Sequence, residues 1–251
     1  MITDYQAIVN NNQVPELRDM LDQFQAAELQ ENSWTRLQII AAQAAEYEKD
    51  SQAAIQKYGQ ALGAKDLGIK TEAYHRRAKV FERVNIDEAL AHYNEGIDLL
   101  EKSPFTNRLR LLQMYIDRAW IFIEQRPDLD KAAATLRRAD TLIDRRHLPE
   151  WADLHNCWGE LFQYKKKFKD AIKYRFRAWL AAQELKDVQG MIKFAHNLGV
   201  DYTKNTGPDH PFAQVAIERS PYSTCHSDFG QNLAPTLRDS DQSRNDKCAK
   251  G

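Results

Sequence analysis

Residues 155–162 read HNCWGELF and residues 195–202 read AHNLGVDY, so one pattern returns after 40 residues. Both stretches place a large apolar residue directly before a glycine, and an aromatic residue three positions after it. A glycine in the middle of a helix costs up to about 1 kcal/mol relative to alanine. We therefore expect Gly159 and Gly199 at places where the missing side chain lets a neighbouring helix approach closely. Looser versions of the pattern occur at residues 74–81 and 115–122.

A second pattern places small residues on one stripe of a helix. A small residue is followed four positions later by a large one and seven positions later by another small one. Four such stripes occur, and their first residues are 35, 43 and 39 residues apart, which leaves room for another helix between successive stripes. Each unit is therefore predicted to be a helix pair. The stripes are Ala54, Tyr58 and Ala61; Ala89, Tyr93 and Gly96; Ala132, Leu136 and Ala139; and Ala171, Arg175 and Ala178.

Turn signals lie between the predicted helices. Asn85 is predicted to cap the helix that carries Ala89, with Glu88 completing a capping box. Residues 126–128, Arg-Pro-Asp, are predicted to act in the same way, and Pro149 suits a first helical turn. The stretches QENSWTRL (30–37), KSPFTNRL (102–109) and RRHLPEWADL (145–154) are predicted breaks between units. Residues 10–24 are expected to form a degenerate second helix, and no strand signal is present.

These residues resemble the tetratricopeptide repeat family, whose helix-turn-helix unit carries small and aromatic residues at similar offsets. The resemblance covers residues 1–206 and implies an all-α, right-handed superhelical solenoid of antiparallel helix pairs, with about five repeats. Arg175 stands where the family has an aromatic residue, Arg77 stands where it has an aliphatic one, and the spacing exceeds 34 residues. The longer period is similar to that of the subclass found in regulatory, sensor and scaffold proteins.

The repeat pattern stops at residue 206. Residues 207–251 contain four of the eight prolines and few large apolar residues, so this segment is predicted to be an irregular, largely disordered tail. One prediction is a short capping helix at residues 211–219 that covers the last repeat. The other is that more repeats belong here and that the tail is a truncated or out-of-frame ending. Reading the coding DNA in its other frames past codon 206 would decide between the two.

Composition and motifs point away from several classes of protein. The formal net charge is −1, the first residues do not form a secretory signal, and no apolar run approaches the roughly 20 residues that span a bilayer. Three scattered cysteines do not make a disulfide framework, so we expect a cytoplasmic protein without a membrane partner. No phosphate-binding, dinucleotide-binding or hydrolase motif occurs. Neither Cys157 nor the adjacent Cys225 and His226 belong to a motif with the sequence spacing of zinc ligands. We predict no enzymatic activity, no cofactor and no metal site.

The run KKKFKDAIKYRFR at residues 165–177 is strongly basic and could contact phosphates. The favoured interpretation is the solvated face of a second helix, because no comparable basic stripe continues onto neighbouring repeats. A nucleic-acid-binding repeat protein that uses this run and the basic residues at 76–83, among them Arg77, is the alternative function.

The resemblance implies that first helices line a concave groove. We predict a non-catalytic scaffold, a regulatory or sensor arm of a signalling system, that binds a protein or peptide there. No small-molecule ligand is implied. Asn197 with Lys193 and Lys204 could hold a peptide backbone or a carboxylate. The candidate groove residues are His75, Arg76, Lys79, Arg83, Asn156, Glu160, Gln163, Lys193, Asn197 and Lys204.

Overall fold

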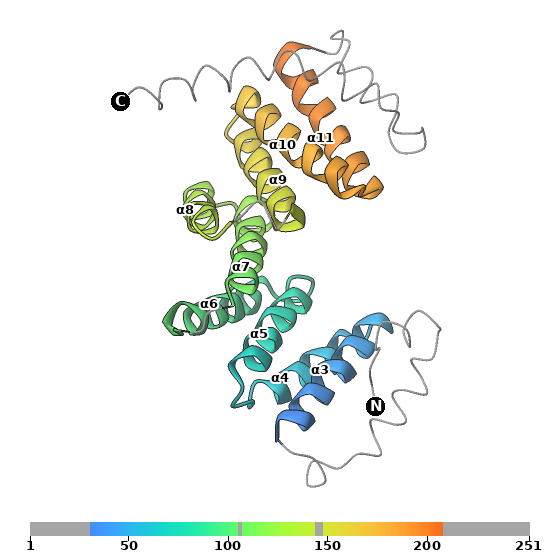
Figure 1. Ribbon diagram of the computed structural model, residues 1–251, viewed down its shortest axis with the longest axis vertical. Helices are drawn as coiled ribbons and strands as arrows, with labels where there is room; N and C mark the ends of the chain where they lie inside the picture. The colour runs from blue at the N-terminus through green and yellow to red at the C-terminus, as the bar shows by residue number, and fades with distance from the viewer. Residues whose placement is uncertain (1–30, 105–106, 144–147, 208–251) are drawn as a thin grey trace. The chain divides into compact units, whose positions relative to one another are not determined.

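The computed structural model describes residues 31–104, 107–143 and 148–207 (Figure 1). Within these ranges every regular element is a helix, so the predicted all-α class is confirmed. The chain divides into two compact units, Met1–Leu142 and Ile143–Gly251, which are described separately below. None of the helices in the described ranges combines the length and the apolar character needed to cross a membrane.

In the first unit, residues 31–104 and 107–142 form three consecutive helix pairs. Short turns join neighbouring helices, which run in opposite directions (Figure 1). Within each pair the two helices pack along each other. The pairs are α3 (Glu31–Tyr47) with α4 (Ser51–Ala61), α5 (Leu67–Phe81) with α6 (Ile86–Lys102), and α7 (Arg108–Trp120) with α8 (Leu129–Asp140). A single π turn, η2 (Ile121–Gln125), ends α7.

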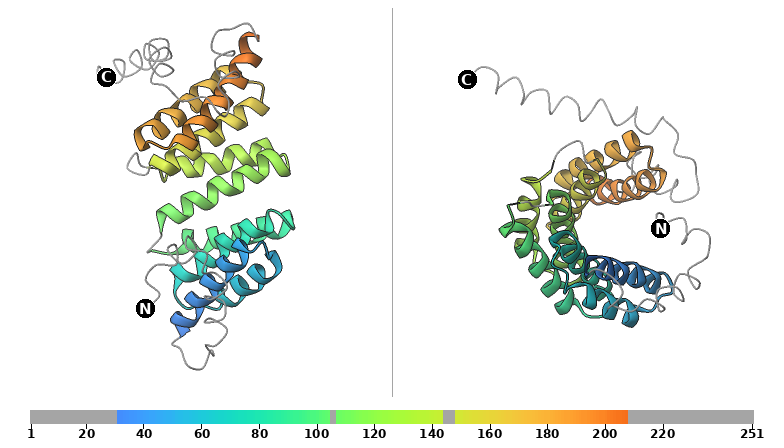
Figure 2. Two further views of the ribbon diagram at one scale, coloured as in Figure 1. Left: turned by 90° about the vertical axis from the view of Figure 1, so that its right-hand side faces the viewer. Right: turned by 60° about the horizontal axis from the view of Figure 1, so that its bottom comes forward.

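The described part of the second unit holds one further pair, followed by a single helix. Its helices are α9 (Leu148–Tyr164), α10 (Phe168–Leu185) and α11 (Val188–Thr206). The middle helix, α10, packs against both α9 and α11, and the three lie side by side in both views of Figure 2. The described residues therefore contain four complete pairs and α11, which agrees with the prediction of about five repeats.

The stripes of small residues lie at the contacts between helices, as predicted. All twelve residues of the four stripes are buried, and so are the small residues of the first helices, Ala78, Ala119, Gly159 and Gly199. A Cβ atom added at Gly96 would lie 2.3 Å from Met114 Cε, and one at Gly159 would lie 2.5 Å from Arg175 Cγ. Both glycines therefore stand where a side chain from the neighbouring helix fills the space.

Side-chain caps begin most of the helices. The Asn85 side chain accepts hydrogen bonds from the Asp87 and Glu88 N–H groups, and Asp128 accepts one from the Lys131 N–H. The predicted capping box is only half correct. The Asn85 N–H donates to the Phe81 carbonyl oxygen and is therefore already satisfied from the preceding helix, without Glu88.

Some predicted boundaries differ from the structure, and others lie outside the described residues. The breaks predicted at residues 30–37 and 145–154 are too long, because residues 31–37 belong to α3 and residues 148–154 belong to α9. The helix expected at residues 10–24, the capping helix expected at 211–219 and the irregular tail from residue 208 lie outside the described residues. At the end of α11, Gly207 has φ of 90°, a left-handed conformation that favours glycine and suits a helix end.

Candidate functional site

The candidate residues of the first unit lie on the first helix α5 or just after its end. Helix α5 contacts both α3 and α7. His75, Arg76 and Lys79 are on α5, while Arg83 is exposed and follows the end of this helix. The structure joins the first three to acidic side chains that the sequence pattern did not single out, and these acids form two centres.

Asp117 on α7 is the first acidic centre. Its Oδ2 accepts a hydrogen bond from His75 Nε2 at 2.7 Å and lies 3.2 Å from Lys79 Nζ. Burial alone would raise the pKa of Asp117, but the His75 hydrogen bond and the Lys79 charge outweigh it and hold the pKa below its usual value. Burial lowers the pKa of His75 despite the nearby carboxylate. A neutral His75 therefore donates to an ionised Asp117, and half of the Lys79 side chain stays exposed beside them.

Glu72 on α5 is the second acidic centre. Its carboxylate pairs with Arg76 Nε at 3.0 Å within the same helix and with Arg110 Nη2 on α7 at 3.5 Å. When the Gln43 amide is turned so that its oxygen faces α5, it also accepts from Arg76, at 2.9 Å from Nη2. Side chains from three successive first helices thus form one ordered polar surface.

In the first two pairs, the large residue of the second-helix stripe is a tyrosine that is hydrogen-bonded to a glutamate on the preceding first helix or at its end. Tyr58 donates to Glu46 and Tyr93 donates to Glu82, and in both cases the acid lies 11 or 12 residues earlier. Burial is the main cause that raises the pKa of both phenols, which are therefore neutral donors. At the same place in the third pair the large residue is Leu136, which is apolar and buried.

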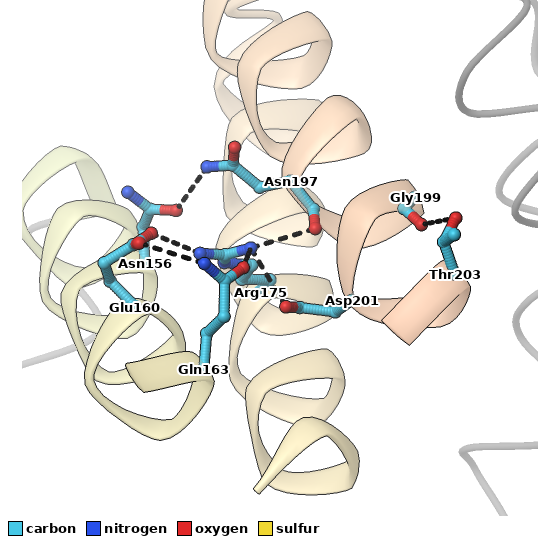
Figure 3. A network of polar contacts seen from close by, with 8 residues as sticks. All are labelled: Asn156, Glu160, Gln163, Arg175, Asn197, Gly199, Asp201 and Thr203. Atoms are coloured by element: carbon cyan, nitrogen blue, oxygen red, sulfur yellow. Dashed lines mark hydrogen bonds and ion pairs between the residues drawn. The ribbon is translucent and has the colours of Figure 1, made fainter. Parts of the chain in front are cut away.

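In the second unit the residue at this place is Arg175, which is 1% exposed. Its guanidinium pairs with Glu160, donates to Gln163 Oε1 at 3.1 Å and donates to the Asn197 carbonyl oxygen at 2.9 Å (Figure 3). The interpretation of Arg175 as part of a solvated basic face is therefore wrong. The apolar environment of the helix contact would be costly for this charge, and the polar partners from α9 and α11 offset that cost.

Asp201 on α11 is the second carboxylate near Arg175. Arg175 Nη1 lies 3.0 Å from Asp201 Oδ2, but neither carboxylate oxygen accepts a well-aligned hydrogen bond. Asp201 is 0% exposed, and burial raises its pKa to about 7, helped by the charge of Glu160 and opposed by that of Arg175. Glu160 is thus the main counter-ion of Arg175. Asp201 is a weaker one, because a carboxyl group with a pKa of about 7 is only partly ionised at neutral pH.

The structure brings the two asparagines of the predicted set together. Asn197 Nδ2 donates to Asn156 Oδ1 at 3.2 Å, which links α11 to α9 (Figure 3). Asn156 is 1% exposed, so it is a packing contact and not an open groove residue. Lys193 and Lys204 are exposed, Lys193 lies over the Phe194 ring, and neither joins the Arg175 group directly.

Sequence reasoning missed four charged residues of these groups: Glu72, Arg110, Asp117 and Asp201. The signal that finds the first three is an opposite charge about one repeat away, because Lys79 and Asp117 are 38 residues apart, as are Glu72 and Arg110. Cys157 is fully buried on α9. In the part of the chain that the structure describes, no group of three or more His, Cys, Asp or Glu side chains is arranged to hold a metal ion.

No family model matches the chain, and no curated protein matches it in sequence. Solved structures do match it. BtubC (BKLC) from P. vanneervenii has a TM-score of 0.66 at 18% identity, over 87% of this chain and 89% of that one. The C-terminal part of a TPR repeat-containing protein from Cytophaga hutchinsonii has a TM-score of 0.57 at 13% identity, over 85% and 75% of the two chains.

A third structure is also built of TPR-like repeats. The TPR-like repeats of a putative kinesin light chain from Podospora anserina have a TM-score of 0.56 at 13% identity, over 76% of this chain and 94% of that one. At such low identities the likeness concerns the fold alone. The chain therefore has the antiparallel helix-pair fold of tetratricopeptide-repeat proteins, which its stripes of small residues predict.

Proposed function

We propose that the chain is a non-catalytic protein-interaction scaffold that binds an extended or helical segment of a partner protein on the face formed by its first helices. The observation that carries this proposal is the ordered polar surface of the first unit. There, Asp117 and Glu72 hold cationic side chains of two successive first helices in fixed positions.

This surface suits recognition because its side chains are fixed before a partner arrives. Lys79 and Arg76 keep 50% and 40% of their side chains exposed although one end of each is paired. Ordering a flexible side chain at an interface costs about 0.5–1.5 kcal/mol, and side chains that are already ordered avoid part of this cost. Carboxylates or carbonyl oxygens of a bound segment can accept from the donors that remain.

We also propose an extent, a location and a role for the repeat domain. The repeat domain extends over residues 1–206, acts in the cytoplasm and serves as a regulatory or sensor arm of a signalling system. Its partner is a protein, and the bound segment lies along several first helices. The long repeat period and the near-zero net charge support these assignments.

The test is a selection of displayed peptides against the full chain, followed by affinity measurements with the peptides that are enriched. We expect Lys79→Gln and Arg76→Gln to weaken their binding about fivefold or more, because each removes a charge-assisted hydrogen bond to the bound segment. Lys102→Gln, an exposed residue at the end of the second helix α6, is the matched control and should change the affinity less than twofold. Peptides whose affinity is the same for all three variants would contradict the proposal.

A further inference from the structure

A pocket of about 680 Å³ lies in the first unit between α6, the end of α7 and α8. It takes residues from the second helices α6 and α8, from the π turn η2 and, on the first helix α7, Arg118, but none from α3 or α5. The residues of the polar surface on the first helices, such as Lys79, Asp117 and Glu72, do not line it. Leu90 from α6 and Phe122 from η2 give the pocket apolar lining.

The charges that line this pocket are mostly positive. Four cationic side chains and one carboxylate take part, namely Arg118, Arg126, Lys131, Arg138 and Asp128. Asp128 is already engaged, because its carboxylate caps α8 through the Lys131 N–H and pairs with Lys131 Nζ at 2.9 Å. Arg126 and Arg138 pair with Asp87 and Glu101, which do not line the pocket. These two pairs are largely exposed, so each contributes little to stability and can rearrange towards another anion.

Arg118 is half-buried, whereas the other three cations of the pocket are exposed. Its Nη1 donates to the neutral Asn94 side chain at 2.8 Å, and its guanidinium lies 5.4 Å from the centre of the Tyr115 ring. Its Nε is buried without a hydrogen-bond partner. Burial is the main cause that lowers the pKa of this guanidinium, and the charge of Arg138 adds to it, while the charges of Glu101 and Asp98 oppose it; the charge of Arg118 is thus only partly compensated where it lies. An anion in the pocket would supply the missing compensation.

The backbone around Arg118 is well fixed. In the π turn, the Arg126 N–H donates to the Ile121 carbonyl oxygen at 2.9 Å, and the Asp128 N–H donates to the Phe122 carbonyl oxygen at 2.8 Å. Single π turns inside helices are frequent at functional sites. Here the turn places Phe122 and Arg126 in the lining of the same pocket as Arg118.

We propose that this pocket binds an anionic peptide segment of a partner protein, with an acidic or phosphorylated side chain on Arg118 and a neighbouring aliphatic side chain against Leu90 and Phe122. The shared chemistry is an oxyanion next to an apolar group. A carboxylate and a phosphate both match the planar donor fork of arginine. The site is a second one, beyond the first-helix surface of the proposed function, and does not depend on that function.

The experiment measures binding of fluorescein-labelled heptapeptides to the full chain by anisotropy at 50 and 150 mM salt. One peptide has two aspartates around a leucine, the second has phosphoserines and the third has asparagines in the same places. We expect the first or the second to bind and the third to bind at least about tenfold more weakly, because affinity depends on the anion. The stronger of the two anionic peptides tells a carboxylate source from a phosphate source.

Variants of the full chain connect the binding to the pocket. Arg118→Gln and Lys131→Gln should each weaken the anionic peptide about fivefold to tenfold, whereas Arg137→Gln, an exposed cation beside Arg138 that does not line the pocket, should change it less than twofold. Lys131 is exposed, so its variant remains informative if Arg118→Gln does not fold. Lys79→Gln should have no effect, which separates this site from the first-helix surface.

Three results would overturn the proposal. The first is the absence of binding by both anionic peptides at 50 mM salt. The second is an equal loss of affinity in Arg137→Gln and in the two pocket variants. The third is an oligonucleotide of deoxythymidines that binds through Arg118 when neither peptide does, since the pocket would then belong to nucleic acid.

Discussion

Gly159 on α9 and Arg175 on α10 occupy one contact, and each explains the other. The glycine leaves room for the aliphatic part of the arginine, and the guanidinium then reaches its partners on α9 and α11. An arginine that is 1% exposed at a place where a Tyr or Leu occurs in the other stripes would be destabilising without these partners.

We expect Gly159→Ala to destabilise the protein by about 1–3 kcal/mol, since a Cβ atom 2.5 Å from Arg175 Cγ overfills a packed contact. Gly59→Ala on α4 is the matched control. Its Cβ would lie 3.5 Å from Arg77 Cζ, an ordinary contact, so alanine should gain up to about 1 kcal/mol from helix propensity. Urea unfolding of both variants measures the difference, and a Gly159→Ala variant as stable as the parent would contradict this packing.

Asp201 gives a pH dependence with a definite sign. Its pKa is about 7 in the folded chain, whereas an ordinary aspartate, as in the unfolded chain, has a pKa of 3.8. Between these two pH values the unfolded chain is ionised at Asp201 while the folded chain keeps the proton. The stability linked to Asp201 is complete below pH 3.8 and is lost as the pH rises through 7. Asp201→Asn removes this titration. From pH 5 to pH 8 the variant should therefore gain about 1–3 kcal/mol relative to the parent.

Denaturant unfolding at the two pH values tests this expectation, with Asp170→Asn as the control for an exposed carboxylate on α10. A relative loss of stability in Asp201→Asn at pH 8 would show the opposite, namely that an ionised Asp201 supports Arg175 as a full ion pair.

At the scale of the helix, capping side chains determine where a helix begins, and the stripes of small residues determine how it packs against its neighbours. The Asn85 side chain satisfies two N–H groups at the start of α6, and Glu88 is not needed for the N–H of Asn85. We expect Asn85→Ala to cost about 1 kcal/mol of stability, and Glu88→Ala to cost less than about 0.5 kcal/mol. Chemical denaturation of the two variants compares them. Equal losses would mean that the full capping box forms in solution.

The sequence predicts the helices well because their signals are local. Small residues at offsets of four and seven, and caps such as Asn85 and Asp128, lie within one helix or one turn. The start of α3 was missed because Asn32 and Ser33 resemble a turn, whereas α3 already begins at Glu31. Tertiary packing outweighs such weak local preferences.

The candidate site was only partly predictable because its partners come from other repeats. His75 and Lys79 follow from helical phase, but Asp117 is found only if a charge one repeat later is considered. Asn156 is expected in an open groove but is buried. The helical period tells which side of the helix a residue lies on, but not how closely the neighbouring helix covers that side. The pocket at Arg118 has no pattern in the sequence, since a π turn interrupts the helical period there.

At the scale of the whole molecule, charge decides between protein and nucleic-acid partners. The formal net charge is −1, so there is no general attraction to a polyanion. The basic run at 165–177 is also weaker than its sequence implies, because Arg175 is buried against Glu160 and Asp201. Its remaining cations occupy one helix and the turn before it, and a single basic stretch neutralises few phosphates.

We therefore expect the full chain not to shift a 20-nucleotide single strand or duplex at about 150 mM salt, and to shift it only weakly at about 50 mM, because few counterions are released. A gel-shift series over this range measures the salt dependence. If weak binding at low salt comes from the exposed lysines of the run, Lys167→Gln with Lys169→Gln removes it, whereas Arg175→Gln leaves it unchanged. A steep salt dependence, equivalent to about five or more phosphate contacts, would instead assign the chain to nucleic acid, because the slope measures the number of phosphates that the protein neutralises.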